Sequence, residues 1–362
     1  MGAELERRLS NYQPLWNEWY IDSFLGESSS AAVYRLKDKN GRKSAVRVLT
    51  IDTRRQGGHL AELTAAAVKR INDKLPLAGE SFIVSARNYI IKNHENIGGA
   101  PVAADILVQT DEYEPLSKLT AQGQLPYVTA RKLADNLCRG IRTAHKAGFT
   151  FGDISTDNIW TDSERHFCID APCTFDPAHP DLTYAAPETQ NDSYDPRKAD
   201  IYSYGLVLYR IFNGGLLPLQ HEGESDEQAT KARLSGEAFD PPRGAPPELA
   251  RFIMQCCMAH PETRYESMDE VYRVLSQLTI DRVPTEYEAC YVCDPCSSHK
   301  KAEEQELPAP TEETAPAAVH RQPPEEGEFR ESKGMRLYVM VLLYMLLVAG
   351  TGFLFYSIFF MK

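Results

Sequence analysis

The stretch Gly152-Asp153-Ile154-Ser155-Thr156-Asp157-Asn158 decides the fold of this 362-residue chain. In it an aspartate is followed five residues later by an asparagine, and the apolar run Phe167-Cys168-Ile169 then presents a second aspartate, Asp170, twelve residues after Asn158. Two carboxylates and an amide in one short stretch are candidate site residues. The alternative is turn chemistry for Asp153 and Asn158 and a helix cap for Asp170.

Further motifs extend from this stretch in both directions. Downstream lie Tyr184-Ala185-Ala186-Pro187-Glu188, Asp200-Ile201-Tyr202-Ser203-Tyr204-Gly205 and His260-Pro261-Glu262-Thr263-Arg264. Upstream lie Leu25-Gly26-Glu27-Ser28 with Val33-Tyr34, and then Ala45-Val46-Arg47. In this order and spacing they resemble the motifs of protein kinases, from the glycine-rich loop to the late arginine. The resemblance covers roughly Trp16 to Leu278 and is nearest to the bacterial membrane-anchored Ser/Thr protein kinases.

The resemblance implies an α+β, bilobal protein-kinase fold with a small β-rich N-lobe and a larger helical C-lobe, and the hydrophobic pattern agrees. Short strands are expected at 19–25, 31–36, 44–49, 82–91 and 104–109. Helices are expected at 59–75, from 126 onward, and at 199–212, 249–258 and 268–278. We therefore place an N-terminal extension at 1–16 and a protein-kinase-like domain at 17–280.

The resemblance also implies ATP and Mg²⁺ as cofactors and assigns roles to individual residues. Asp153 would position the substrate hydroxyl, and Asn158 and Asp170 would hold the metal. Arg47 stands where the family has its lysine, with Glu62 as the expected partner, while Arg264 would pair with Glu188. Residues expected to contact the nucleotide are Gly26, Val33, Ala45, Arg47, Gln109 and Asp111, the last two in an adenine hinge that is read mainly through its backbone.

The chain departs from the family pattern at the residues that would bind phosphate and substrate. Ser28 and Ala31 replace two of the three loop glycines, and side chains there hinder close approach of the backbone to phosphates. Arg47 favours a bidentate pair with a carboxylate over a point contact to phosphate, and Lys43 is the alternative phosphate contact. Ser155 and Asp181 replace the lysine and threonine that would hold the substrate hydroxyl.

Two hypotheses therefore stay open. In the first, the chain is an enzyme, a transferase that moves phosphate from ATP to Ser or Thr of cytoplasmic proteins in signalling. In the second, it is a pseudokinase, a regulatory scaffold that binds a partner protein. The intact set of Asp153, Asn158 and Asp170 favours the first hypothesis or a nucleotide-binding form of the second. The altered phosphate-binding and substrate-binding residues favour the second.

Composition narrows the class of partner. The chain has 39 Lys plus Arg against 51 Asp plus Glu, so its formal charge is −12, which argues against a nucleic-acid binder. Eight scattered cysteines fit a reducing compartment. Cys138, Cys168, Cys256 and Cys257 lie in apolar runs and are expected to be core residues. Cys290, Cys293, Cys296 and His299 have metal-ligand spacing, with reduced thiols or lipidation as the alternative.

The C-terminal part of the chain predicts a tether and an anchor. Residues 281–336 include nine glutamates and five prolines between Lys301 and Gly334, which predicts an extended, disordered linker. Residues 337–361 contain no charged side chain and would form a helix of about 37 Å, long enough to cross a hydrocarbon core of about 30 Å. Arg321, Arg330, Lys333 and Arg336 precede it and only Lys362 follows, so we expect a single-pass, C-terminally anchored protein with a cytoplasmic kinase-like domain.

Overall fold

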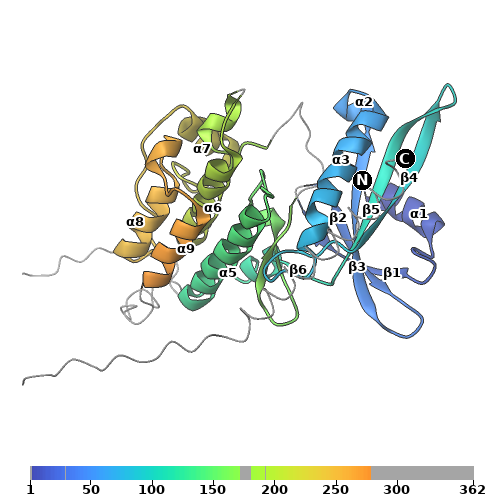
Figure 1. Ribbon diagram of the computed structural model, residues 1–362, viewed down its shortest axis with the longest axis horizontal. Coiled ribbons are helices and arrows are strands. Elements are labelled where there is room, and N and C mark those ends of the chain that lie inside the picture. Colours follow the sequence, from blue (N-terminus) through green and yellow to red (C-terminus); the bar gives the residue numbers. More distant parts are fainter. Residues whose placement is uncertain (1, 29, 172–180, 192, 279–362) are drawn as a thin grey trace, which may run out of the picture. The chain divides into compact units, whose positions relative to one another are not determined.

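The computed structural model describes residues 2–28, 30–171, 181–191 and 193–278. These residues form two lobes, which lie on the right and left of Figure 1. The predicted linker at 281–336, the predicted membrane helix at 337–361 and the residues Cys290, Cys293, Cys296 and His299 lie outside the described residues. Within the described part of the chain, no helix is both long and apolar enough to cross a membrane.

The N-lobe is built on a five-stranded antiparallel sheet in the order β1-β2-β3-β5-β4. Its strands are β1 (Tyr20–Glu27), β2 (Ala32–Lys37), β3 (Lys43–Asp52), β4 (Asn88–Ile97) and β5 (Ala100–Thr110). Its helices are α1 (Gly2–Tyr12), α2 (Thr53–Gln56) and α3 (Leu60–Lys74), and the 3₁₀ turn η1 (Leu75–Leu77) follows α3. The strands predicted at 19–25, 31–36, 44–49 and 104–109 and the helix predicted at 59–75 are confirmed.

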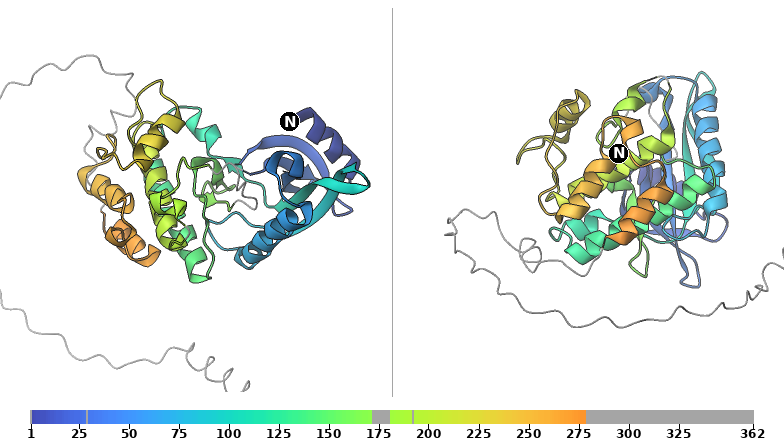
Figure 2. Two further views of the ribbon diagram at one scale, coloured as in Figure 1. Left: turned by 90° about the horizontal axis from the view of Figure 1, so that it is seen from above. Right: turned by 60° about the vertical axis from the view of Figure 1, so that its left-hand side comes forward.

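The two faces of this sheet are covered by different helices, as the two views of Figure 2 show. Alternate residues of a strand point to opposite faces. Val46 and Val48 of β3 pack in one cluster with Leu5 and Leu9 of α1, whereas Leu49, Ile51 and Ile71 pack in another cluster with α3. The sheet is therefore sandwiched between α1 and α3.

Helix α1 belongs to the sheet although the predicted domain boundary at residue 17 leaves it out. Its Arg8 donates to both carboxylate oxygens of Asp105 at 2.8 and 3.0 Å, and Tyr12 donates to the same carboxylate at 3.0 Å. Thr50 of β3 donates to it at 2.7 Å, and Asp105 is completely buried. A buried carboxylate needs such partners, so α1 supplies part of what the sheet requires.

The predicted strand at 82–91 is wrong at its start. Strand β4 begins at Asn88, while Ile83 forms only an isolated bridge with Ile169. The backbone N–H of Val84 donates to the Ile169 carbonyl at 2.9 Å, and the N–H of Ile169 donates to the Phe82 carbonyl at 2.9 Å. Residues 82–84 are apolar because they join the lobes and not because they form a strand of the N-lobe sheet.

The C-lobe is helical apart from a small sheet in the order β6-β7-β8. Its strands are β6 (Glu114–Pro115), β7 (Ile159–Thr161) and β8 (Phe167–Ile169). Its helices are α4 (Ser117–Thr120), α5 (Tyr127–Lys146), α6 (Pro196–Phe212), α7 (Asp226–Leu234), α8 (Pro247–Cys256) and α9 (Met268–Gln277). Its 3₁₀ turns are η2 (Thr156–Asn158), η3 (Pro187–Gln190) and η4 (Pro261–Thr263).

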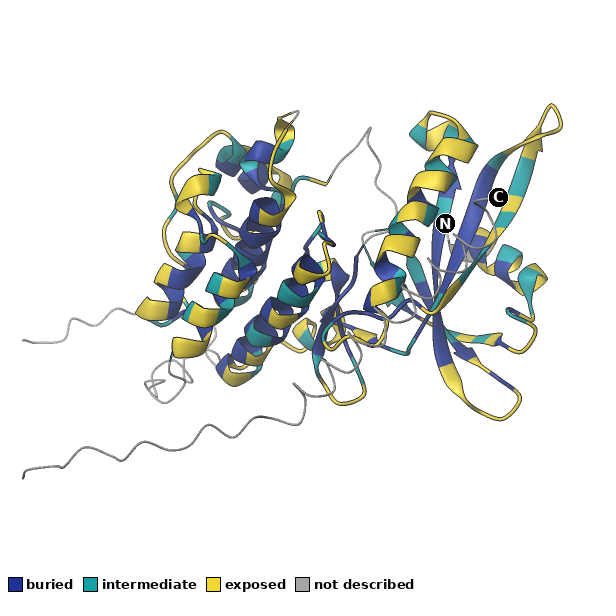
Figure 3. Cartoon of the chain, viewed as in Figure 1, coloured by how far each residue is buried: buried dark blue, intermediate teal, exposed yellow. Residues whose placement is uncertain are grey.

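Helix α6 is the centre of the C-lobe. It is buried along almost all of its length, whereas α5 and α9 keep exposed outer faces (Figure 3). Gly205 lets α8 approach, because a Cβ at this position would lie 2.6 Å from Cys256 Cβ. The predicted helices that begin near 126, 199, 249 and 268 are confirmed as α5, α6, α8 and α9. The α+β class and the bilobal arrangement follow from these elements.

Candidate nucleotide site

The loop between α5 and η2 is fixed by a buried aspartate of α6. The Asp200 carboxylate accepts the backbone N–H groups of Phe151 and Gly152, each at 2.8 Å, and lies 2.9 Å from His145 Nε2. Gly152 has a φ of +74°, a left-handed conformation that glycine adopts readily. These bonds fix the backbone immediately before Asp153, so this loop is positioned by the C-lobe core.

The expected catalytic residue Asp153 and the expected metal ligands Asn158 and Asp170 lie together. Asn158 Nδ2 donates to the Asp153 carbonyl at 3.0 Å and to Asp153 Oδ2 at 3.2 Å. The backbone N–H of Asp170 donates to the Asn158 carbonyl at 2.7 Å. The spacing in the sequence therefore corresponds to real proximity in the fold. Asp153 is partly exposed, whereas Asn158 and Asp170 are buried.

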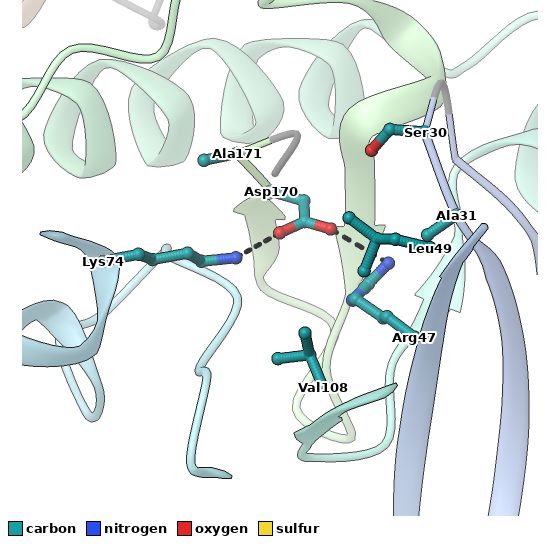
Figure 4. A pocket seen from close by; sticks show the side chains of 8 residues that line it. All are labelled: Ser30, Ala31, Arg47, Leu49, Lys74, Val108, Asp170 and Ala171. Atoms are coloured by element: carbon teal, nitrogen blue, oxygen red, sulfur yellow. Dashed lines mark hydrogen bonds and ion pairs between the residues drawn. The ribbon is translucent and has the colours of Figure 1, made fainter. Parts of the chain in front are cut away.

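Two cations from the N-lobe pair with the Asp170 carboxylate (Figure 4). Arg47 Nη1 lies 3.0 Å from Asp170 Oδ2, and Lys74 Nζ donates to Asp170 Oδ1. The three side chains, which we call the Asp170 cluster, are no more than 5% exposed. Burial by itself raises the pKa of the Asp170 carboxyl, but Arg47 and Lys74 hold that pKa below its usual range. Asp170 is thus an ionised carboxylate that protein cations already bind.

The expected pair between Arg47 and Glu62 is not what the structure forms. Glu62 is exposed in the first turn of α3, twelve residues or about 18 Å of helix before Lys74. The basic residue that reaches the site is at the other end of the same helix. Ala67, Ile71 and Lys74 form the buried stripe of α3, so a lysine on an apolar helical face was the available signal in the sequence.

The predicted nucleotide residues Val33 and Ala45 are each 1% exposed and pack against the C-lobe. They belong to a cluster of buried side chains that draws on both lobes and that we call the inter-lobe cluster. Its members are Leu25, Val33, Ala45, Val84, Tyr113, Trp160 and Cys168. Trp160 of β7 is completely buried in it, and the Arg47 guanidinium lies 4.2 Å from the centre of its ring. Side chains therefore fill the space in which the resemblance would place an adenine.

Backbone groups of the predicted hinge form hydrogen bonds with other residues of the protein. The Gln109 carbonyl accepts the N–H of Arg87 at 2.9 Å, and the N–H of Asp111 donates to Ser85 Oγ at 3.2 Å. Tyr113 also contacts this segment, because its hydroxyl accepts the N–H of Ser85 at 3.2 Å. The hinge therefore has internal partners for the groups that would read a base.

The loop between β1 and β2 lies close to the hinge side of the C-lobe. A Cβ on Gly26 would lie 3.1 Å from Pro115 Cγ, so the strand passes directly over β6. The Ser28 N–H donates to the Ala31 carbonyl at 2.9 Å, which closes the turn. Lys43, the alternative phosphate contact, is exposed at the start of β3.

As the described residues stand, ATP and Mg²⁺, which the fold family implies, do not fit the region around Asp170 and Trp160. The cavity beside the Asp170 cluster has a volume of about 10 Å³, which is about the room that one water molecule needs. It is lined by Ser30, Ala31, Arg47, Leu49, Lys74, Val108, Asp170 and Ala171. A metal ion at Asp170 would have to displace two buried cations, and a nucleotide would have to displace Trp160.

The segment that leads to Glu188 is held by C-lobe side chains. Arg233 of α7 donates to the Leu182, Thr183 and Ala185 carbonyls at 2.8 to 3.1 Å. The expected pair of Arg264 with Glu188 is formed, with two bonds of 2.6 and 2.8 Å. These contacts fix the segment on the C-lobe.

Ser155 and Asp181, which replace the family's substrate-binding lysine and threonine, have different surroundings. Ser155 is buried, whereas Asp181 is exposed and accepts the backbone N–H of Thr183 at 2.9 Å. Asp181 therefore stabilises a local turn.

The four cysteines of the folded part are core residues, as predicted. Cys138, Cys168, Cys256 and Cys257 are buried and unbridged. Burial raises the pKa of the Cys138 and Cys168 thiols to about 12, so both are neutral at physiological pH.

A two-lobed domain with this catalytic loop and this Glu188–Arg264 pair defines the protein-kinase fold. The model of the family described as "Protein kinase domain" matches residues 19–274, and the chain belongs to this family. Helix α1 precedes the matched range, so the family model gives no signal for it.

Curated relatives include both kinases and inactive members. The chain is 24% identical over 211 residues to inactive tyrosine-protein kinase 7 of Homo sapiens, a match covering 54% of this chain and 19% of that protein. It is 23% identical over 297 residues to a probable serine/threonine-protein kinase of Clostridium acetobutylicum, covering 78% of this chain and 43% of that protein. It is 27% identical over 154 residues to a tyrosine-protein kinase-like protein of Drosophila yakuba, covering 38% and 15%. The chain thus spans less than half the length of these relatives.

Proposed function

We propose that this protein is a catalytically inactive member of the kinase family that acts as a membrane-tethered scaffold for a cytoplasmic partner protein. One observation carries the proposal: the metal-binding position Asp170 is buried in ion pairs with Arg47 and Lys74. The filled inter-lobe cluster supports it independently, because the residues that would enclose a nucleotide enclose Trp160. The inactive members among the relatives are consistent with this function.

The alternative is an active kinase that phosphorylates Ser or Thr of cytoplasmic proteins. The contact of Asn158 with Asp153 favours it, because this pair stands in the arrangement that phosphate transfer needs. The matches to serine/threonine-protein kinases also favour it. In that case Asp170 would have to exchange both of its cations for Mg²⁺ before each turnover.

Nucleotide binding separates the two functions. We would measure the thermal unfolding of the full-length protein in detergent micelles with and without 1 mM Mg–ATP, together with phosphate transfer to a Ser/Thr peptide library. A ligand present at about 100 times its Kd stabilises a protein by about 2.7 kcal/mol, which is about 5 to 11 °C for a domain of this size. We expect no shift and no transfer.

A shift that disappears in Asp170→Ala would contradict the proposal and support the active kinase. Asp162→Ala is the matched control, because the partly exposed Asp162 lies in the turn after β7 and outside the nucleotide region.

Membrane anchoring is the second part of the proposal. It is supported by the uncharged run from Leu337 to Met361 and by the excess of Lys and Arg before it. We expect the full-length protein to remain in the membrane pellet after carbonate extraction and its kinase-like domain to be digested by protease from the cytoplasmic side. Leu347→Arg, which places a charge in the middle of the run, should reduce the pelleted fraction, whereas Leu347→Phe should not.

A further inference from the structure

A continuous series of contacts crosses between the two lobes through four side chains. Trp160 of β7 lies under the guanidinium of Arg47 of β3, with 4.2 Å between the guanidinium carbon and the ring centre. Arg47 pairs at 3.0 Å with Asp170, which follows β8, and Asp170 accepts a hydrogen bond from Lys74 of α3. The series alternates between C-lobe and N-lobe residues, so each contact joins the lobes (Figure 4 shows its Arg47–Asp170–Lys74 part).

The members of this series match, group by group, what a ligand between the lobes would supply. The Trp160 indole is a flat two-ring system enclosed by apolar side chains, among them Val33 and Ala45 of the N-lobe sheet. The Asp170 carboxylate supplies the negative charge that two buried N-lobe cations require. We propose that Trp160 and Asp170 act as a built-in ligand that holds the lobes closed, so that the closed conformation does not depend on nucleotide.

Helix α3 shows how far this closure extends. One helical turn before Lys74, Arg70 donates to the Phe151 carbonyl and its guanidinium carbon lies 4.5 Å from the centre of the Phe149 ring. Residues four apart lie on the same face of a helix, so α3 presents two cations side by side to the C-lobe. Both reach groups beside the catalytic loop. The helix is therefore fixed to the C-lobe at two points by side chains of this chain alone.

This inference rests on the proposed absence of nucleotide binding and adds its consequence for regulation. A protein responds to a ligand only to the extent that the ligand distinguishes two conformations. A domain whose own side chains stabilise the closed conformation presents the same surface to its partner at any nucleotide concentration. Its signal is then carried by partner binding and by the amount of protein at the membrane.

Hydrogen exchange on the full-length protein in detergent micelles tests the inference. Trp160→Ala should increase amide exchange of α3 and of β1 at least tenfold, because the lobes lose the ring that joins them. Indole at millimolar concentration should fill the cavity and restore at least half of the lost protection. Trp19→Ala is the matched control, since Trp19 is buried on the α1 side of the N-lobe sheet and not between the lobes. Its effect should be confined to α1 and the neighbouring strands.

The inference is overturned if exchange in Trp160→Ala rises only in β7 and β8 while α3 stays protected, or if indole restores nothing. Trp160→Leu, which keeps an apolar side chain, replaces the alanine variant if that variant does not fold. The two proposals fail separately. Protection of the unmodified protein by Mg–ATP would contradict the proposed function, whatever Trp160→Ala does.

Discussion

Replacing Asp170 with asparagine tests whether this carboxylate stabilises the fold or serves only as a metal ligand. Asp170→Asn keeps the shape of the side chain and removes the charge that Arg47 and Lys74, at 4% and 3% exposure, both use. Removing one partner of a buried ion pair typically costs about 3 to 5 kcal/mol. For a domain of this size that corresponds to a fall in Tm of about 6 to 20 °C.

The assay is thermal unfolding without nucleotide, followed by circular dichroism. Asp153→Asn is the matched control, because Asp153 is partly exposed, whereas the ion pairs of Arg47 and Lys74 are formed with Asp170. In a kinase that uses both aspartates only for catalysis, the two variants would unfold at similar temperatures. Equal Tm values within about 2 °C of the unmodified protein would refute the reasoning.

Two further measurements test the same cause. Lys74→Met added to Asp170→Asn should raise the Tm of the single variant, because it removes a cation left without its carboxylate. The pKa of Asp170 is lowered in the folded state, so its stabilising contribution is complete above the usual carboxyl pKa and is lost as the pH falls through the folded-state value. The deficit of Asp170→Asn should therefore be the same at pH 6 and pH 8 and should shrink below about pH 4.

Two other substitutions have defined outcomes. Arg264→Lys loses the bidentate contact to Glu188 and should cost about 3 kcal/mol in urea unfolding, whereas Arg251→Lys, at an exposed position of α8, should cost little. Arg8→Met leaves Asp105 buried without its cation and should cost about 2 to 3 kcal/mol, while a loss comparable to that of Arg7→Met would show that α1 is dispensable.

Part of this protein follows from local patterns in the sequence. The spacing of Asp153, Asn158 and Asp170 predicted their proximity because a turn and a short strand bring them together over fewer than twenty residues. The Glu188–Arg264 pair also followed from motif order. The elements that were missed have weak local signals. Helix α1 lies outside the family match, and residues 82–84 are apolar for a reason that only the C-lobe reveals.

The sequence by itself determined the family, the order of the elements and the positions at which the phosphate-binding and substrate-binding residues differ from the family pattern. Only the tertiary structure decided which contacts form in place of those to phosphate and metal. Lys74 and Asp170 are 96 residues apart, and Arg47 and Trp160 are 113 apart, so no local pattern shows that they meet. A buried charge must find a partner and a cleft must be filled, and in this chain both needs are met by side chains that folding brings together across the two lobes.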